Sequence, residues 1–237
     1  MRLTLLLVML LSVVTLSAQE NNLNVTQNSS SSLLKVGNAI QSSYGSATIF
    51  HNPVKEAEGS LYLFDDWKNR GVIYAINNQK FGINNINLNV QKNTLEAKIS
   101  NDSIFTFNFN NIEKFIINEK VFKNIYTSNG KKIYEMIYES KDFSILKGYK
   151  IQIVKGSTNP MVNRKNDKYV QRHTYYSYKN NTVHPFKLSK KRVLEIVNNK
   201  ERAKSVDKFM NDNKLSYKNE KDVAKALRAN SVSGGEL

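Results

Sequence analysis

The most conspicuous polar cluster in the sequence is Asp65-Asp66-Trp67, which follows an apolar stretch at 62–64 and contains the single tryptophan of the chain. Two carboxylates beside an indole ring can bind a sugar or a cation, or supply the acid and base of glycoside hydrolysis. The same residues also suit a turn at the edge of a core, because Asp begins turns and Trp packs at core boundaries. Adjacent carboxylates usually point apart, so we favour the turn and keep the three residues as ligand-binding candidates.

A second candidate is the stretch 168–179, in which tyrosines are interleaved with cations. Aromatic rings beside Lys and Arg can stack on sugars or nucleobases. If the stretch is a strand, Tyr176 and Tyr178 share one face and Tyr175 lies on the other, so part of the set belongs to the core. We therefore add Arg172, Tyr176 and Tyr178 to the ligand-binding candidates. The alternative is that they form core and solvated edge.

The sequence contains no recognisable catalytic or metal-binding motif. It has no G-x-S-x-G, H-E-x-x-H, Walker or G-x-G-x-x-G motif, and no cysteine. The histidines His51, His173 and His184 lie in different segments, and none has a second histidine or a carboxylate at ligand spacing. We predict no catalytic residue, no metal ligand and no cofactor. Whether the protein is an enzyme stays open, with the balance against it, and a glycan- or peptide-acting hydrolase is the least favoured alternative.

The N-terminal residues have the pattern of a targeting segment that precedes the folded part of the chain. Arg2, the apolar run 3–16 and Ser17-Ala18-Gln19 have the layout of a signal peptide over 1–18. The run is shorter than the roughly 20 apolar residues that span a bilayer, and no second run of that length follows. We predict export to the periplasm or the exterior, no transmembrane segment after cleavage, and a disordered leader over 19–32.

Positive charge is concentrated in the second half of the chain. The stretch 147–188 holds nine Lys and Arg against one acid, Asp167, for a net charge of +8, out of +15 in the whole chain. A basic half attracts anions, and it predicts an anionic envelope surface, a glycan or another envelope protein as partner. Export argues against a nucleic-acid partner. The alternative is that these lysines are solvated face residues of a Lys- and Asn-rich chain.

Between residues 33 and 188 the pattern predicts short antiparallel strands. Apolar residues alternate with polar ones in 86–91, 95–100 and 105–110, as in strands with one buried and one wet face. Hairpin turns are predicted at 77–78, 92–93, 101–103 and 180–181. The register that these turns imply pairs Tyr74 with Phe81, Val90 with Leu95, and Ile99 with Phe105.

The fold class predicted is α+β: a curved antiparallel β-meander, open or barrel-like, of roughly nine to twelve strands, followed by two or three C-terminal helices. Helices are predicted over 190–199, 201–211 and 220–229, with Ser189 and Asn219 as N-caps. The sequence therefore divides into an antiparallel β domain over 33–188, a basic helical tail over 189–230 and a disordered end over 231–237.

The chain resembles uncharacterised exported proteins of Bacteroidota of the flavobacterial type. The features that carry the resemblance are the leader ending Ala18-Gln19, the Gly-Ser-Leu-Tyr-Leu-Phe-Asp stretch at 59–65 and the Leu-Ser-Lys-Lys entry to the helical tail at 188–191. The resemblance spans 59–230, implies an envelope or extracellular location and transfers no catalytic residue. In that phylum Asp102-Ser103-Ile104 also resembles an O-glycosylation sequon, which makes Ser103, on a predicted turn, a candidate modification site.

Two functional hypotheses follow. The leading one is a non-enzymatic envelope protein that binds a partner or an anionic surface through its basic second half. The alternative is a carrier of a hydrophobic, lipid-like ligand on the concave face of the sheet. They differ in whether that face leaves a cavity lined by residues such as Tyr74, Phe105 and Phe107.

Overall fold

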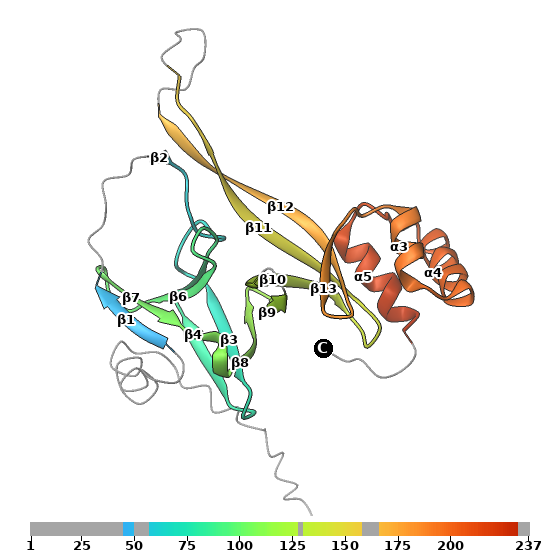
Figure 1. Ribbon diagram of the computed structural model, residues 1–237, viewed down its shortest axis with the longest axis horizontal. Helices are drawn as coiled ribbons and strands as arrows, with labels where there is room; N and C mark the ends of the chain where they lie inside the picture. The colour runs from blue at the N-terminus through green and yellow to red at the C-terminus, as the bar shows by residue number, and fades with distance from the viewer. Residues whose placement is uncertain (1–44, 50–56, 128–129, 158–165, 232–237) are drawn as a thin grey trace, which may run out of the picture.

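The computed structural model describes residues 45–49, 57–127, 130–157 and 166–231. The predicted signal peptide and leader lie outside these residues, as does all of the predicted C-terminal end except Ser231. Within the described ranges the chain forms two β-sheets followed by three helices, so the predicted α+β class is confirmed (Figure 1).

The smaller sheet has four antiparallel strands. Their order is β1 (Gly45–Ile49), β7 (Ser103–Phe107), β6 (Thr94–Lys98) and β5 (Ile86–Asn89). As the alternation predicted, Leu88, Leu95 and Phe105 all point into the core. The other face was predicted to be wet, but Asn87, Asn89 and Glu96 are only 1–2% exposed there. Residues 62–64 cover this face, with hydrogen bonds from the Tyr62 hydroxyl to Glu96 and from the Phe64 N–H to Asn87.

The larger sheet has nine strands and is open. Its order is β13 (Thr182–Phe186), β12 (Asp167–Lys179), β11 (Ser144–Val154), β10 (Gly130–Glu139), β9 (Lys120–Thr127), β8 (Ile112–Ile117), β3 (Arg70–Ala75) and β4 (Lys80–Asn84), with β2 (Ala57–Glu58) paired to β12. From β8 to β13 the strands follow one another as the predicted antiparallel meander. The β2–β12 pair is parallel, a departure from the purely antiparallel prediction. Figure 1 shows β11 and β12 as a long twisted hairpin that runs between the smaller sheet and the helices.

Three predicted registers are wrong in detail. Tyr74 pairs with Lys80, because the β3–β4 loop holds three residues rather than two and closes with Asn78 at φ 63°. This shift of one residue turns Ile73 and Ala75, instead of Tyr74, into the core. The other two registers are displaced by two residues, which keeps the buried faces: Leu88 pairs with Leu95, and Ala97 pairs with Phe105.

The helices are α3 (Lys190–Val197), α4 (Lys200–Asp212) and α5 (Glu220–Ala229). Asn219 caps α5 as predicted, accepting hydrogen bonds from the backbone N–H of Lys221 and Asp222, whereas Ser189 makes no side-chain capping bond. The sequence left open whether this helical tail docks. It does, since α5 contacts β10, and Leu227 and Val223 are buried with Ile145 and Tyr138 of the sheet.

Two hydrophobic cores therefore lie on the same side of the larger sheet. The first is enclosed between the two sheets and contains Phe105, Phe115 and Phe122. The second lies under the helices. A smaller third cluster, with Tyr134 and Leu146, lies on the opposite face, which we call the outer face.

Candidate functional site

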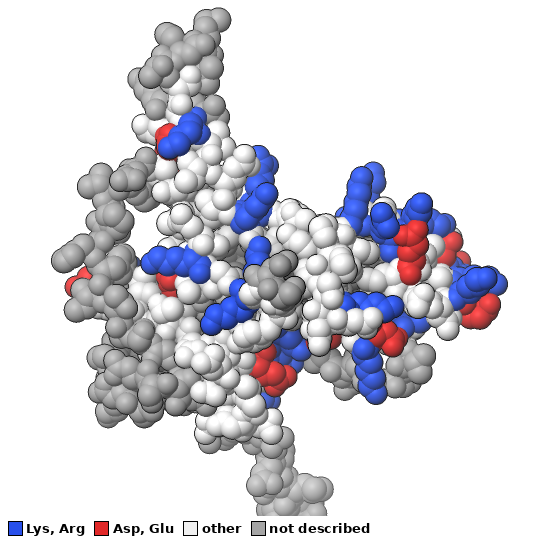
Figure 2. Space-filling model, in the orientation of Figure 1, with Lys and Arg blue, Asp and Glu red and all other residues white. Residues whose placement is uncertain are grey.

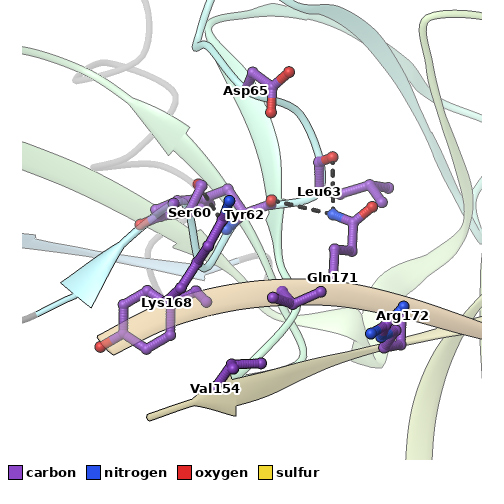
Figure 3. A pocket seen from close by; sticks show the side chains of 11 residues that line it. Ser60, Tyr62, Leu63, Asp65, Val154, Lys168, Gln171 and Arg172 are labelled. Carbon is purple, nitrogen blue, oxygen red and sulfur yellow. Dashed lines mark hydrogen bonds between the residues drawn. The ribbon is translucent and has the colours of Figure 1, made fainter. Parts of the chain in front are cut away.

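A groove of about 710 Å³ lies where residues 59–65 pass the outer end of the β11–β12 hairpin. We call it the edge groove. Its lining comes from two segments far apart in the sequence: Gly59, Ser60, Tyr62, Leu63 and Asp65 on one side, and Val154 with residues 168–172 on the other. Figure 3 shows Lys168 and Gln171 projecting from β12 towards this first segment, with Asp65 on the far side.

The backbone of residues 59–65 forms one wall of the groove and is held by contacts to β12 and to the smaller sheet. The Gln171 side-chain amide donates to the carbonyl oxygens of Tyr62 (3.4 Å) and Leu63 (3.1 Å). Gly59 has φ 92° and passes so close to β12 that a Cβ there would lie 2.6 Å from the Tyr169 carbonyl oxygen. The Leu63 N–H donates to the Leu88 carbonyl oxygen (2.9 Å), so the wall is continuous with β5.

The Asp65-Asp66-Trp67 cluster forms a turn, as the favoured interpretation predicted, and only Asp65 reaches the groove. The Asp66 carboxylate accepts from the Lys68 N–H at 2.8 Å, and the Trp67 ring packs edge-on against Tyr62 with ring centres 4.7 Å apart. Tyr62 is in turn anchored by a hydrogen bond from its hydroxyl to buried Glu96 (2.7 Å). Burial, followed by this hydrogen bond, raises the pKa of Tyr62, which keeps it protonated.

The groove continues into a row of cations on the outer face, which we call the basic row: Lys132, Lys150 and Arg172. They belong to β10, β11 and β12, and Lys150 and Arg172 are direct cross-strand partners. Like charges directly opposite each other destabilise a sheet. Burial and then the charge of Lys150 lower the pKa of Lys132, in keeping with the closeness of these cations.

Acids do not neutralise the basic row within the described residues. Asp167, the one acid of the stretch 147–188, accepts instead from Lys155 Nζ (2.7 Å) and the Gly156 N–H (2.8 Å) at the end of the hairpin. Arg172 bonds to the uncharged Gln152 (3.3 Å). In Figure 2, Lys and Arg lie over the β11–β12 hairpin with few acids beside them, whereas the two charges are intermixed over the helices.

Tyr176 and Tyr178 share the outer face with Arg172, and Tyr175 faces the opposite side, as the alternation predicted. The Tyr176 ring packs edge-on against Tyr134 with ring centres 5.4 Å apart. Both rings lie over Gly148, where a Cβ would approach them to 2.9 Å and 3.0 Å. The two predicted tyrosines are therefore half-buried supports beside the basic row, and the structure separates them from Asp65, Asp66 and Trp67.

Sequence reasoning missed a polar network between the two large cores. The Tyr149 hydroxyl donates to Glu135, whose other oxygen accepts from Lys120 (2.8 Å). Beside them, Glu220 at the start of α5 accepts from Lys147 (2.9 Å) and the Tyr175 hydroxyl (2.7 Å). The signal available was Glu135 itself, a charged residue at an inward position between Ile133 and Ile137.

Replacing Glu220 by Gln should lower the free energy of unfolding by about 1–3 kcal/mol at neutral pH, because Lys147 loses its charged partner. Burial alone would raise the pKa of Glu220, but Tyr175 and Lys147 hold it below the ordinary value of 4.5. A depressed carboxyl pKa contributes stability above the ordinary pKa and loses it as pH falls through the folded-state pKa. Urea denaturation across pH should therefore show the difference from wild type shrinking below pH 4.5. Exposed Glu201→Gln is the matched control, and a pH-independent difference for Glu220→Gln would contradict the assignment.

The remaining sequence candidates lie away from the groove. Ser103 is the first, half-buried residue of β7 and pairs with Ile49, because the loop occupies 100–102 and not the predicted 101–103. Phe105 and Phe107 are 2% and 8% exposed in the first core, so they line no ligand space. Tyr74 lies elsewhere, with Lys80 and Lys114 about 5 Å from its ring centre.

In the described part of the chain, no group of three or more acidic or histidine side chains is arranged to hold a metal ion. His173 stacks edge-on against Tyr149 and Tyr175, and His51 lies outside the described residues. The described helices include none that is long and apolar enough to cross a membrane.

Lys168 and Arg172 are exposed on the same strand and line the same groove. Comparison with known proteins found no match to any family model, curated protein or solved structure.

Proposed function

We propose that the protein is an exported, non-enzymatic envelope protein that binds an anionic partner through the basic row and the edge groove. Export is supported by the signal-peptide pattern of residues 1–18. The partner binds through Lys132, Lys150 and Arg172 on the outer face, and through Lys168 at the groove.

The observation that carries this proposal is the pairing of Lys150 with Arg172 directly across two strands, next to Lys132. Three cations at neighbouring positions lower the stability of the free protein, since each repels the others. An anion placed over them relieves this repulsion, so the arrangement stabilises the complex relative to the free state. Several cations on the helices differ in this respect, because Lys190, Arg192 and Lys204 each have an acidic partner.

The test is a titration of the purified protein with dextran sulfate, a sulfated polysaccharide, between about 0.05 M and about 0.5 M salt. Affinity should fall at least about tenfold over this range, because salt screens contacts between exposed charges. Uncharged dextran is the control and should not bind. Equal affinity for dextran sulfate at both salt concentrations would contradict the proposal.

A further inference from the structure

One edge of β12 has a gap in its strand pairing. On the side of β11, β12 is paired continuously from Lys168 to Tyr178. On the other side, β2 pairs only with Asp167 and Lys168, and β13 pairs only with residues 175–179. No described strand pairs with residues 169–174 on that side, a length of about 20 Å in extended chain.

The edge groove lies along this gap. Gly59 still touches the backbone of Tyr169, but the chain after it leaves β12 and joins the smaller sheet through Leu63. The two walls therefore diverge, with Gln171 bridging them through its bonds to the carbonyl oxygens of Tyr62 and Leu63 (Figure 3). An open edge beside a groove is the setting in which an extended peptide adds a strand to a sheet.

The charges beside the gap indicate which peptide fits. Lys168 and Arg172 lie four residues apart in β12, at alternation-equivalent positions, and both line the groove. A second copy of this chain would place the same cations against each other and is disfavoured by their repulsion. Glu58 of β2 already pairs with Lys168 on this edge. A strand with acidic residues at alternate positions would therefore set one carboxylate beside Arg172 and the next diagonally across from Lys168, with its other side chains beside Tyr169 and Gln171.

We propose that the partner is an extended acidic peptide segment of another protein, bound as an additional strand on the free edge of β12 between β2 and β13. This inference rests on the proposed function and narrows it from an anionic partner to a peptide strand. Backbone hydrogen bonds to residues 169–174 hold the segment, and the alternate acidic side chains fix its register.

The experiment compares two probes of equal charge: a capped heptapeptide of sequence Glu-Val-Glu-Thr-Glu-Val-Glu, and the same peptide with alternate backbone nitrogens methylated to remove the donors that face β12. The unmodified peptide should bind at least about tenfold more tightly, since several backbone hydrogen bonds depend on those donors. It should also slow hydrogen exchange at amides within 169–174. Arg172→Gln should weaken binding about fivefold, whereas Lys208→Gln on α4 should not.

The outcomes show whether strand addition fails alone or together with the proposed binding of anions. Equal binding of the two peptides, with dextran sulfate still bound, would overturn strand addition and leave the proposed function standing. Protection at the edge strand β4 or β13 in place of residues 169–174 would also overturn it. If neither the peptides nor dextran sulfate bind at low salt, both proposals are overturned.

Discussion

Replacing Lys150, Lys168 and Arg172 together by glutamine is expected to weaken binding to dextran sulfate about 100-fold at low salt. A cation next to an anionic surface contributes about 1 kcal/mol, so the loss of three amounts to about 3 kcal/mol. The three side chains are exposed, and none has an ionic partner among the described residues, so the substitution removes charge without breaking an ion pair. Isothermal titration or fluorescence anisotropy measures the change.

The matched control removes the same charge from the helical tail. Lys208, Lys221 and Lys225 are exposed on α4 and α5, and their triple glutamine variant has the same net charge as the first variant. It should bind with nearly wild-type affinity if the site is local. The variant lacking Lys150, Lys168 and Arg172 should also be no less stable than wild type, because it removes the repulsion between Lys150 and Arg172. Equal weakening by both variants would show that only total charge matters and would contradict a defined site.

Phe115→Ala should lower the free energy of unfolding by about 3–5 kcal/mol, the largest stability effect expected in this protein. Phe115 is fully buried between the two sheets; its ring stacks on that of Phe122 with centres 5.2 Å apart, and the tilted ring of Phe109 lies 5.7 Å away. Alanine at position 115 leaves a cavity between the two sheets, and the neighbouring rings can fill it only if the sheets shift relative to each other. Urea denaturation followed by circular dichroism measures the effect.

Ile76→Ala is the comparison for this core variant. Ile76 is 63% exposed in the β3–β4 loop, so its truncation should change the free energy of unfolding by no more than about 0.5 kcal/mol. A loss below about 1 kcal/mol for Phe115→Ala would mean that the two sheets do not enclose a common core.

Side-chain alternation made the buried faces of the smaller sheet predictable. Ile86, Leu88, Leu95, Ala97 and Phe105 recur at a period of two, and all of them enter the first core. The predicted wet face was wrong for β5 and β6, because Asn87, Asn89 and Glu96 are buried as well. Local signals also sufficed for α5, whose cap Asn219 precedes an apolar stripe, and for the turn at Asn180-Asn181, where both residues have positive φ.

Strand pairing was less predictable because asparagine admits several loop geometries. Asn78, Asn93 and Asn118 all have positive φ, and such a residue can close a loop of two, three or four residues. Each length sets another register, and the choice depends on which side chains the opposing sheet accepts. For β3 this contact favoured Ile73 over Tyr74, which local sequence could not indicate.

The candidate site was only partly predictable, because it depends on contacts between segments that are far apart in the sequence. Asp65 and Arg172 were expected to bind ligand and both line the edge groove, but Tyr62, Lys168 and Gln171 were missed. Their proximity results from β2 pairing in parallel with β12 across more than 100 residues of chain, which no local pattern encodes. Charge asymmetry located the basic stretch, whereas the cross-strand register revealed which of its cations face each other.

The most direct test of a binding site on the β11–β12 hairpin is a nuclear magnetic resonance titration of isotope-labelled protein with a short sulfated oligosaccharide. The signals that shift should be those of Lys132, Lys150, Lys168 and Arg172 and of their strand neighbours, while those of α3 to α5 stay in place. Shifts spread evenly over all exposed lysines, or confined to the helices, would contradict it.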